Sequence, residues 1–177
     1  MSAKFNLGTR KSSGGREQTR RGNGAAKPRF THLDAAGAAR MVDIGAKPVV
    51  TRVAIAVGAL RCRPSTISAL RRRALAKGDA LAVARVAGIQ GAKRAHEWIP
   101  LCHPLPLDAV KVDFEMRRDR IRIVAEARAT ARTGVEMEAL VAVSAAALAL
   151  YDMAKAVDRG MRIEGVRLLS KTKVPRA

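Results

Sequence analysis

Aromatic side chains are scarce in this sequence, since Phe, Trp and Tyr make up 3% of its 177 residues. Apolar residues of all kinds reach 48%, so a core of ordinary size has to be built from Ala, Val, Leu and Ile. The two cysteines, Cys62 and Cys102, cannot make a disulfide framework. We therefore expect one folded domain in a reducing, cytoplasmic setting.

Long uncharged apolar runs are also absent. No stretch of about 20 apolar residues is free of charge, so the sequence predicts no membrane span. Residues 1–24 contain no apolar segment of the kind that secretory signals carry. The His and Cys residues form neither a C-x-x-C nor an H-E-x-x-H pattern, and we expect no metal site.

Acidic residues are few beside the basic ones, and the net charge is +19. Residues 1–30 hold eight Lys and Arg against one acid, with many Gly and Ser, which predicts a disordered basic tail that contacts RNA or acidic surfaces without specificity. The remaining +12 lies on residues 31–177, which we expect to form a single domain. An anionic ligand and a solvated Arg-rich surface would both explain this excess, and charge alone does not decide between them.

The periodicity of apolar residues predicts an α+β fold. We expect strands, helices and a hairpin in the following order: strand 49–60, helix 64–78, helix 80–98 with Asp79 as its N-cap, hairpin strands 109–116 and 120–127, helix 136–159 and strand 161–170. This is a ferredoxin-like βαββαβ sandwich with an extra helix in the first crossover. Right-handed crossovers place the helices on one face of an antiparallel sheet.

The loop at residues 98–107, "WIPLCHPLPL", contains three prolines, which remove backbone donors and fix φ. Cys102 and His103 are therefore held in a defined orientation. A ligand-binding or catalytic loop and a rigid connector both remain open from the residues alone. A Cys–His nucleophilic pair is not favoured, because neighbouring side chains in an extended loop point apart.

In the long helix predicted at residues 136–159, most of the stretch 139–159 is small and apolar on every side, but Asp152 and Lys155 interrupt it three residues apart on one face. They could be a surface ion pair, or an acid–base pair in a cleft with pKa values displaced by burial and by each other. At the start of this helix we expect Thr133 to be the cap and Glu136 to close a capping box. That explanation is weaker for Glu138.

Seven fragments in this order resemble one known family: "MVDI", "KPVVTR", "KGD", "ARVAGIQGAKR", "IPLCHPLPL", "TGVEMEAL" and "YDMAKAVDR". From Thr31 to Lys171 the chain is similar to the cyclic pyranopterin monophosphate synthase (MoaC) family of molybdenum cofactor biosynthesis. The resemblance implies a lyase that converts (8S)-3′,8-cyclo-7,8-dihydroguanosine 5′-triphosphate to cyclic pyranopterin monophosphate and pyrophosphate. It also implies a homohexamer, a trimer of dimers with the active site at a dimer interface, and a small-molecule substrate without a cofactor.

The resemblance also assigns roles to residues of this sequence. Asp152 and Lys155 of "YDMAK" would be the catalytic pair. The residues implied to bind the substrate are Leu101, Cys102, His103, Met137, Glu138, Glu136, Lys77, Lys93, Arg52 and Lys171. The family implies no membrane contact, and nucleic acid would be contacted only through the basic tail.

The sequence departs from the family at three places. Ala154 stands where Cys is usual, Val53 replaces a frequent Glu, and Lys171 is followed by "TKVPRA" in place of a "KSGGKSG"-like segment. An alternative is therefore a catalytically weak relative that binds a nucleotide-like ligand or a partner subunit. A basic RNA-binding protein is a third interpretation, which depends on residues 1–30.

Overall fold

The computed structural model describes residues 37–72 and 74–174. The tail that we predict at residues 1–30 lies outside the described residues. The elements are β1 (Val50–Arg61), α1 (Pro64–Arg71), α2 (Ala80–Lys93), α3 (Ala95–Trp98), β2 (Ala109–Met116), β3 (Arg120–Ala131), α4 (Glu136–Ala154) and β4 (Arg162–Val174).

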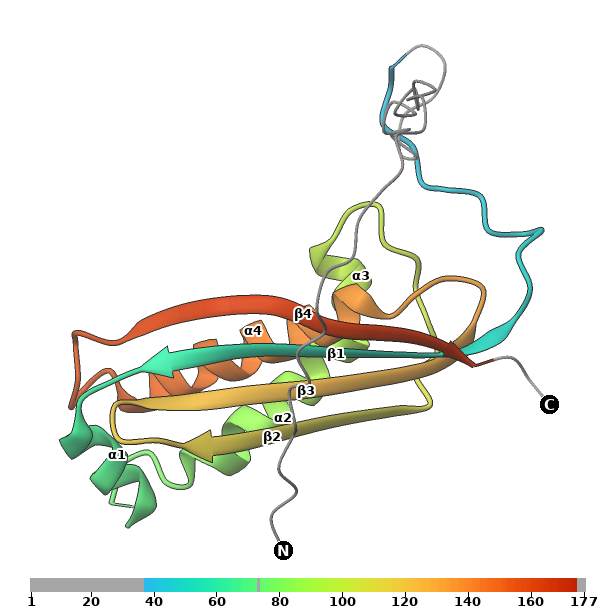
Figure 1. Cartoon of the computed structure of the whole chain (residues 1–177). Coiled ribbons are helices and arrows are strands. Elements are labelled where there is room, and N and C mark those ends of the chain that lie inside the picture. Colours follow the sequence, from blue (N-terminus) through green and yellow to red (C-terminus); the bar gives the residue numbers. More distant parts are fainter. Residues whose placement is uncertain (1–36, 73, 175–177) are drawn as a thin grey trace, which may run out of the picture. The chain divides into compact units, whose positions relative to one another are not determined.

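The four strands form one antiparallel sheet in the order β2-β3-β1-β4. Helices α2 and α4 cover one face of this sheet (Figure 1). Alternating residues of β1 and β3 point toward the helices and are buried, among them Ala54, Leu60, Ile121 and Ile123. The α+β class, the element order and the one-sided helical layer are therefore confirmed.

Helix α4 is apolar all round because it lies between the sheet and α2. By length and composition alone it could cross a membrane, but 61% of its apolar window is buried within the protein, as in a core helix. The two helices approach closely at Gly88 and Gly91. A Cβ at Gly91 would lie 2.7 Å from the Cβ of Ala145, so this contact requires glycine.

Asp79 caps α2 as predicted, because its carboxylate accepts hydrogen bonds from the backbone N–H groups of Leu81 and Ala82, both at 3.1 Å. The predicted ends of three helices are wrong. The helix predicted at residues 80–98 is divided at Arg94 into α2 and α3. Helix α1 ends at Arg71 instead of residue 78, and the chain then turns so that Leu75 is buried in the core.

Helix α4 ends at Ala154 instead of residue 159. The chain then turns tightly, and the N–H groups of Val157 and Asp158 both donate to the carbonyl of Ala154. Strand β4 continues beyond the predicted residue 170 to Val174 and pairs with Thr51 at that end. The last described residues therefore belong to the sheet.

Candidate active site

The proline-rich loop packs against the N-terminal end of α4. Leu101, Cys102 and His103 are half-buried and line a cavity of about 550 Å³. The same cavity is lined by Glu136 and Met137 from the first turn of α4 and also by Lys171 from β4. Six of the residues that the sequence assigns to substrate binding therefore surround one hollow.

Glu138 is the most buried acid of this group, with 3% of its surface exposed. Its Oε1 accepts a hydrogen bond from the Cys102 thiol at 3.7 Å, while its Oε2 is buried without a partner in the described part of the chain. Burial raises the pKa of Glu138 above its ordinary value. An unsatisfied buried carboxylate oxygen is costly, and this oxygen keeps the capacity to accept a hydrogen bond from a bound molecule.

Cys102 is not activated as a nucleophile. Burial, followed by the nearby charge of Glu138, raises the pKa of its thiol to about 11. The thiol is therefore protonated near neutral pH and donates its hydrogen to Glu138. This supports the sequence argument against a Cys–His nucleophilic pair.

Glu136 does not close a capping box, so this prediction is wrong. The N-cap of α4 is Val135, and no side chain caps this helix end. The Glu136 carboxylate instead accepts a hydrogen bond from Lys171 at 3.1 Å. It also folds over Gly134, where a Cβ would overlap it.

Arg52 is buried at the start of β1. Its guanidinium donates hydrogen bonds to the backbone carbonyls of Ala131 and Arg132, both at 3.0 Å. It lines a smaller hollow of about 320 Å³ together with Lys171 and Lys173. The sequence signal for Arg52 was its place in "KPVVTR", and Lys173 lies opposite it in the β1–β4 register.

Lys93 ends α2, which runs antiparallel to α4: Gly88 contacts Ala142 and Ala146, whereas Gly91 contacts Val141 and Ala145. Lys93 is therefore at the same end of α4 as Glu138, and its side chain is exposed. Residues before β1 complete the cavity at this end, and the sequence analysis did not assign them. They are Val42, Ile44 and Lys47, and their only signal was the matched "MVDI" and "KP" fragments.

Asp152, Lys155 and Lys77 meet at the other end of α4. The Asp152 carboxylate contacts the ammonium groups of Lys155 and Lys77, each at 2.7 Å, and the carbonyl of Asp152 accepts a further hydrogen bond from Lys77 at 3.0 Å. The hydrogen bonds from Lys155 and Lys77 lower the pKa of Asp152 to about 2. Asp152 in turn raises the pKa of Lys155.

The Asp152–Lys155 pair is not buried within one chain, because the side chains are 55% and 57% exposed. The pKa of Asp152 is therefore lowered by Lys155 and Lys77, and the pKa of Lys155 is raised by Asp152, rather than by burial. Asp152 and Lys155 therefore form the exposed ion pair that was one of the two interpretations of the sequence, and within residues 37–72 and 74–174 no cleft encloses them.

The assigned residues thus form two groups at opposite ends of α4. Fourteen residues separate Glu138 from Asp152, which is about 21 Å along a helix axis. The two groups therefore do not meet within one chain. In residues 37–72 and 74–174, no three His, Cys, Asp or Glu side chains gather in a way that could hold a metal ion.

The sequence is similar to proteins of known activity. The MoaC family profile matches residues 41–173. The cyclic pyranopterin monophosphate synthase of Novosphingobium aromaticivorans is 57% identical over 142 residues, which cover 80% of this chain and 90% of that protein. The synthase of the same name from Thermomicrobium roseum is 56% identical over 144 residues, 80% of this chain and 87% of its own length. The one from Streptomyces avermitilis is 53% identical over 147 residues, covering 83% and 86%.

Proposed function

The chain belongs to the MoaC family and acts as a cyclic pyranopterin monophosphate synthase, a lyase of molybdenum cofactor biosynthesis, and we propose that its active site is completed only where two protomers meet. The observation that carries this proposal is the separation of the two residue groups along α4. If two copies pack antiparallel about a two-fold axis, the Asp152 end of one α4 faces the Glu138 end of its partner. Each dimer then contains two identical sites.

The substrate in this proposal is the cyclo-dihydroguanosine triphosphate, which is converted to the cyclic monophosphate with release of pyrophosphate. A triphosphate of about four negative charges needs several Lys or Arg groups around it. Lys77 and Lys155 supply two from one protomer, while Lys93, Arg52 and Lys171 supply three from the other. This distribution supports a substrate that bridges the two ends.

The protonation states favour separate roles for the catalytic pair. With a pKa of about 2, Asp152 is ionised near neutral pH, whereas the raised pKa of Lys155 keeps its ammonium protonated. Lys155 is then ready to donate a proton or to neutralise developing charge, and Asp152 positions it together with Lys77. Burial raises the pKa of Glu138, so this carboxyl group takes up a proton more readily than an exposed glutamate and is suited to exchange one with the substrate.

The alternative of a catalytically weak relative rested on the altered segment after Lys171. Lys171 and Lys173 belong to strand β4 and line the hollow beside Glu136, so basic groups are present there without a glycine-rich segment. We therefore propose that the chain catalyses the reaction itself and is not a catalytically weak relative. The proposal also includes a cytoplasmic homohexamer built as a trimer of dimers, whose mass by light scattering should be six times the chain's 18.9 kDa.

The test of the shared site is subunit mixing. Lys155→Ala and Glu138→Gln chains are each expected to be inactive as homo-oligomers. If they are unfolded together and refolded as a mixture, random pairing should restore about a quarter of the wild-type sites, because half of the dimers are mixed and each mixed dimer contains one unaltered site. Product formation and pyrophosphate release measure this recovery.

The matched control mixes Lys155→Ala with Asp152→Asn, which alter the same end of α4. No pairing of these chains yields an unaltered site, so this mixture should remain inactive. Absence of recovery in the Lys155–Glu138 mixture, with mixed oligomers demonstrated by mass spectrometry, would overturn the two-protomer site.

A further inference from the structure

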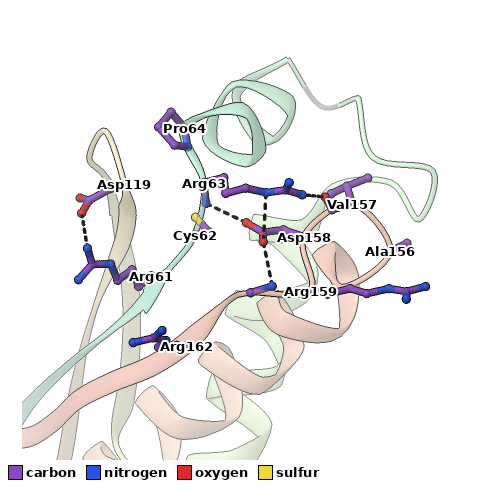
Figure 2. A pocket seen from close by; sticks show the side chains of 11 residues that line it. Arg61, Cys62, Arg63, Pro64, Asp119, Ala156, Val157, Asp158, Arg159 and Arg162 are labelled. Atoms are coloured by element: carbon purple, nitrogen blue, oxygen red, sulfur yellow. Dashed lines mark hydrogen bonds and ion pairs between the residues drawn. The ribbon is translucent and has the colours of Figure 1, made fainter.

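A further hollow, of about 800 Å³, lies where β1 ends and β4 begins, apart from the two hollows of the candidate active site (Figure 2). Four arginines line it, and we call it the arginine hollow: Arg61, Arg63, Arg159 and Arg162. It shares no lining residue with the catalytic or substrate-binding residues assigned above. Its other charged lining residues are two acids, Asp119 and Asp158, so the lining carries a net positive charge.

The arginines are placed side by side by the register of the sheet. Arg61 lies directly opposite Arg162 of β4 on one side and opposite Arg120 of β3 on the other. Residues that are directly opposite project to the same face, so three guanidinium groups share one end of the sheet. Like charges in such positions repel each other, and this row is costly unless acids or a bound anion neutralise it.

The neighbouring acids neutralise this row unevenly. Asp119 contacts Arg120 at 3.0 Å but lies 3.9 Å from Arg61, and Glu164 contacts Arg120 at 3.3 Å. Arg120 therefore forms ion pairs with two acids, whereas Arg61 has only the longer contact with Asp119. Within residues 37–72 and 74–174, neither Arg162 nor Arg159 forms an ion pair. The positive charge that remains unpaired is on the residues that line the hollow.

Asp158 holds the wall of the hollow in place through hydrogen bonds, and it does not pair with Arg159 or Arg162. It is 1% exposed, and its carboxylate accepts hydrogen bonds from the N–H of Arg63 at 2.8 Å, the hydroxyl of Thr66 at 2.9 Å and the N–H of Gly160 at 3.1 Å. The Arg63 guanidinium, 3.3 Å from Asp158, also donates to the carbonyl of Val157. Figure 2 shows the contacts of Arg63 with Asp158 and Val157, which join the end of β1 to the loop after α4, so the wall is fixed before a ligand arrives.

We propose that the arginine hollow binds the phosphate group of a small anion, at a site separate from the one where the lyase reaction occurs. Guanidinium groups recognise phosphate oxygens through paired, charge-assisted hydrogen bonds. Arg162 and Arg159 have no competing acid within the described residues, and the volume lies in the range of small-molecule sites, about 300–1,000 Å³. Inorganic phosphate, pyrophosphate and a nucleotide all present this group.

The test measures binding of radiolabelled pyrophosphate to the full chain by equilibrium dialysis at constant ionic strength. A Lys155→Ala background is used, which weakens binding at the lyase site and makes the result independent of turnover. We expect saturable binding there, and the added pair Arg159→Gln and Arg162→Gln should weaken it at least tenfold, about the effect of losing one charge-assisted hydrogen bond. Both arginines are exposed and without ion pairs in the described residues, so thermal melting should show that the fold is retained.

The matched control adds the double substitution Arg128→Gln and Arg117→Gln to the same Lys155→Ala background. It removes the same amount of charge at exposed positions that do not line the hollow. An equal loss of affinity in this control, or no loss in the Arg159–Arg162 variant, would overturn the proposal. Competition against the labelled pyrophosphate separates the sources: displacement by inorganic phosphate and by GTP at similar concentrations supports a free anion, and displacement by GTP at concentrations at least tenfold lower than unlabelled pyrophosphate supports a nucleotide phosphate. Absence of saturable pyrophosphate and GTP binding in the Lys155→Ala chain would also overturn it.

Discussion

The carboxylate of Asp152 lies between two ammonium groups, and this small cluster explains why charged residues interrupt an otherwise apolar helix. Each oxygen contacts a different lysine, Lys155 within the same helix turn and Lys77 from the turn before α2. The two lysines lower the pKa of Asp152, and Asp152 raises the pKa of Lys155. An exposed pair such as Asp152–Lys155 contributes little to folding stability, so its value is expected to be in catalysis.

Asp152→Asn and Lys155→Ala should therefore each abolish activity without disturbing the fold. Loss of a catalytic acid or base costs about 10²- to 10⁴-fold in rate, and we expect losses in this range. Pyrophosphate release and cyclic pyranopterin formation are the measurements, with size-exclusion chromatography to confirm that the assembly persists. Activity near that of the wild type in either variant would remove the assignment of that residue.

The sequence predicted the members of this cluster only in part. Spacing placed Asp152 and Lys155 on one face, but Lys77 is 75 positions from Asp152 and no periodicity links them. The same limit explains the wrong capping box, because the partner of Glu136 is Lys171, which a long-range contact brings from β4. Local patterns predict local pairs, whereas contacts between distant elements required the resemblance or the structure.

At the scale of elements, the packing of α2 on α4 fixes the position of Lys93, at the end of α2, relative to Glu138 at the start of α4. Gly88 and Gly91 let the helix backbones approach, and a Cβ at Gly88 would lie 2.9 Å from the carbonyl oxygen of Ala142. Lys93, two residues beyond Gly91 and five beyond Gly88, is placed by the same contact. A change in this contact would move Lys93 relative to Glu138.

Gly91→Val should destabilise the protein, because the new side chain would overlap Ala145 and Val141 of α4. Overpacking of this kind costs about 1–3 kcal/mol of unfolding free energy. Ala82→Val, at an exposed position on the same helix, is the control and should change it by about 0.5 kcal/mol or less. Chemical denaturation of both variants provides the comparison, and equal stabilities would contradict the close contact.

Asp158 joins the loop between α4 and β4 to the start of α1, and its effect on stability should depend on pH. Burial opposes its ionisation, but the hydrogen bonds from Arg63, Thr66 and Gly160 outweigh burial and lower its pKa in the folded chain. A lowered pKa means that this stabilisation is present above the unfolded value of about 3.9 and is lost as the pH falls through the folded value.

Asp158→Asn should accordingly lower the free energy of unfolding by about 2–4 kcal/mol at pH 7, since it leaves buried donors poorly matched. The difference from the wild type should shrink as the pH falls below about 3.9. Urea denaturation at several pH values measures it. A difference that stayed constant with pH would show that the Asp158 charge does not stabilise this junction.

Element order was predictable from sequence, whereas element ends were not. Alternation in residues 109–127 was enough for the β2–β3 hairpin, and Asp79 marked the start of α2 correctly. Helix α1 ended early because burial of Leu75 in the core outweighed helix formation beyond Arg71. Tertiary packing decides where such elements end, and the contacts that make up this packing cannot be identified from local sequence patterns.

At the scale of the whole molecule, charge is divided between the folded domain and the N-terminal residues. The family match begins at residue 41, and residues 1–30 carry +7 of the net charge +19. The residues that line the two hollows of the candidate active site all lie between Val42 and Lys173. The first 30 residues are therefore expected to act separately from the lyase reaction.

A chain that begins at residue 31 should retain kcat/KM for the triphosphate within about twofold, yet bind RNA more weakly and with a smaller dependence on salt, because each lost phosphate contact lowers the salt slope by about one. Filter binding at several salt concentrations and steady-state kinetics measure the two effects. A large fall in turnover would place the first 30 residues in the active site.

Helix α4 also limits how the length of this chain can vary. In the proposed dimer, the two ends of each α4 belong to two different active sites. One residue inserted anywhere between Glu138 and Asp152 would therefore turn these ends by about 100° relative to each other and shift them by about 1.5 Å. Both sites of a dimer would be misaligned at once, even though the insertion touched no substrate. The number of residues in the middle of α4 is then as much a property of the catalyst as the side chains at its ends.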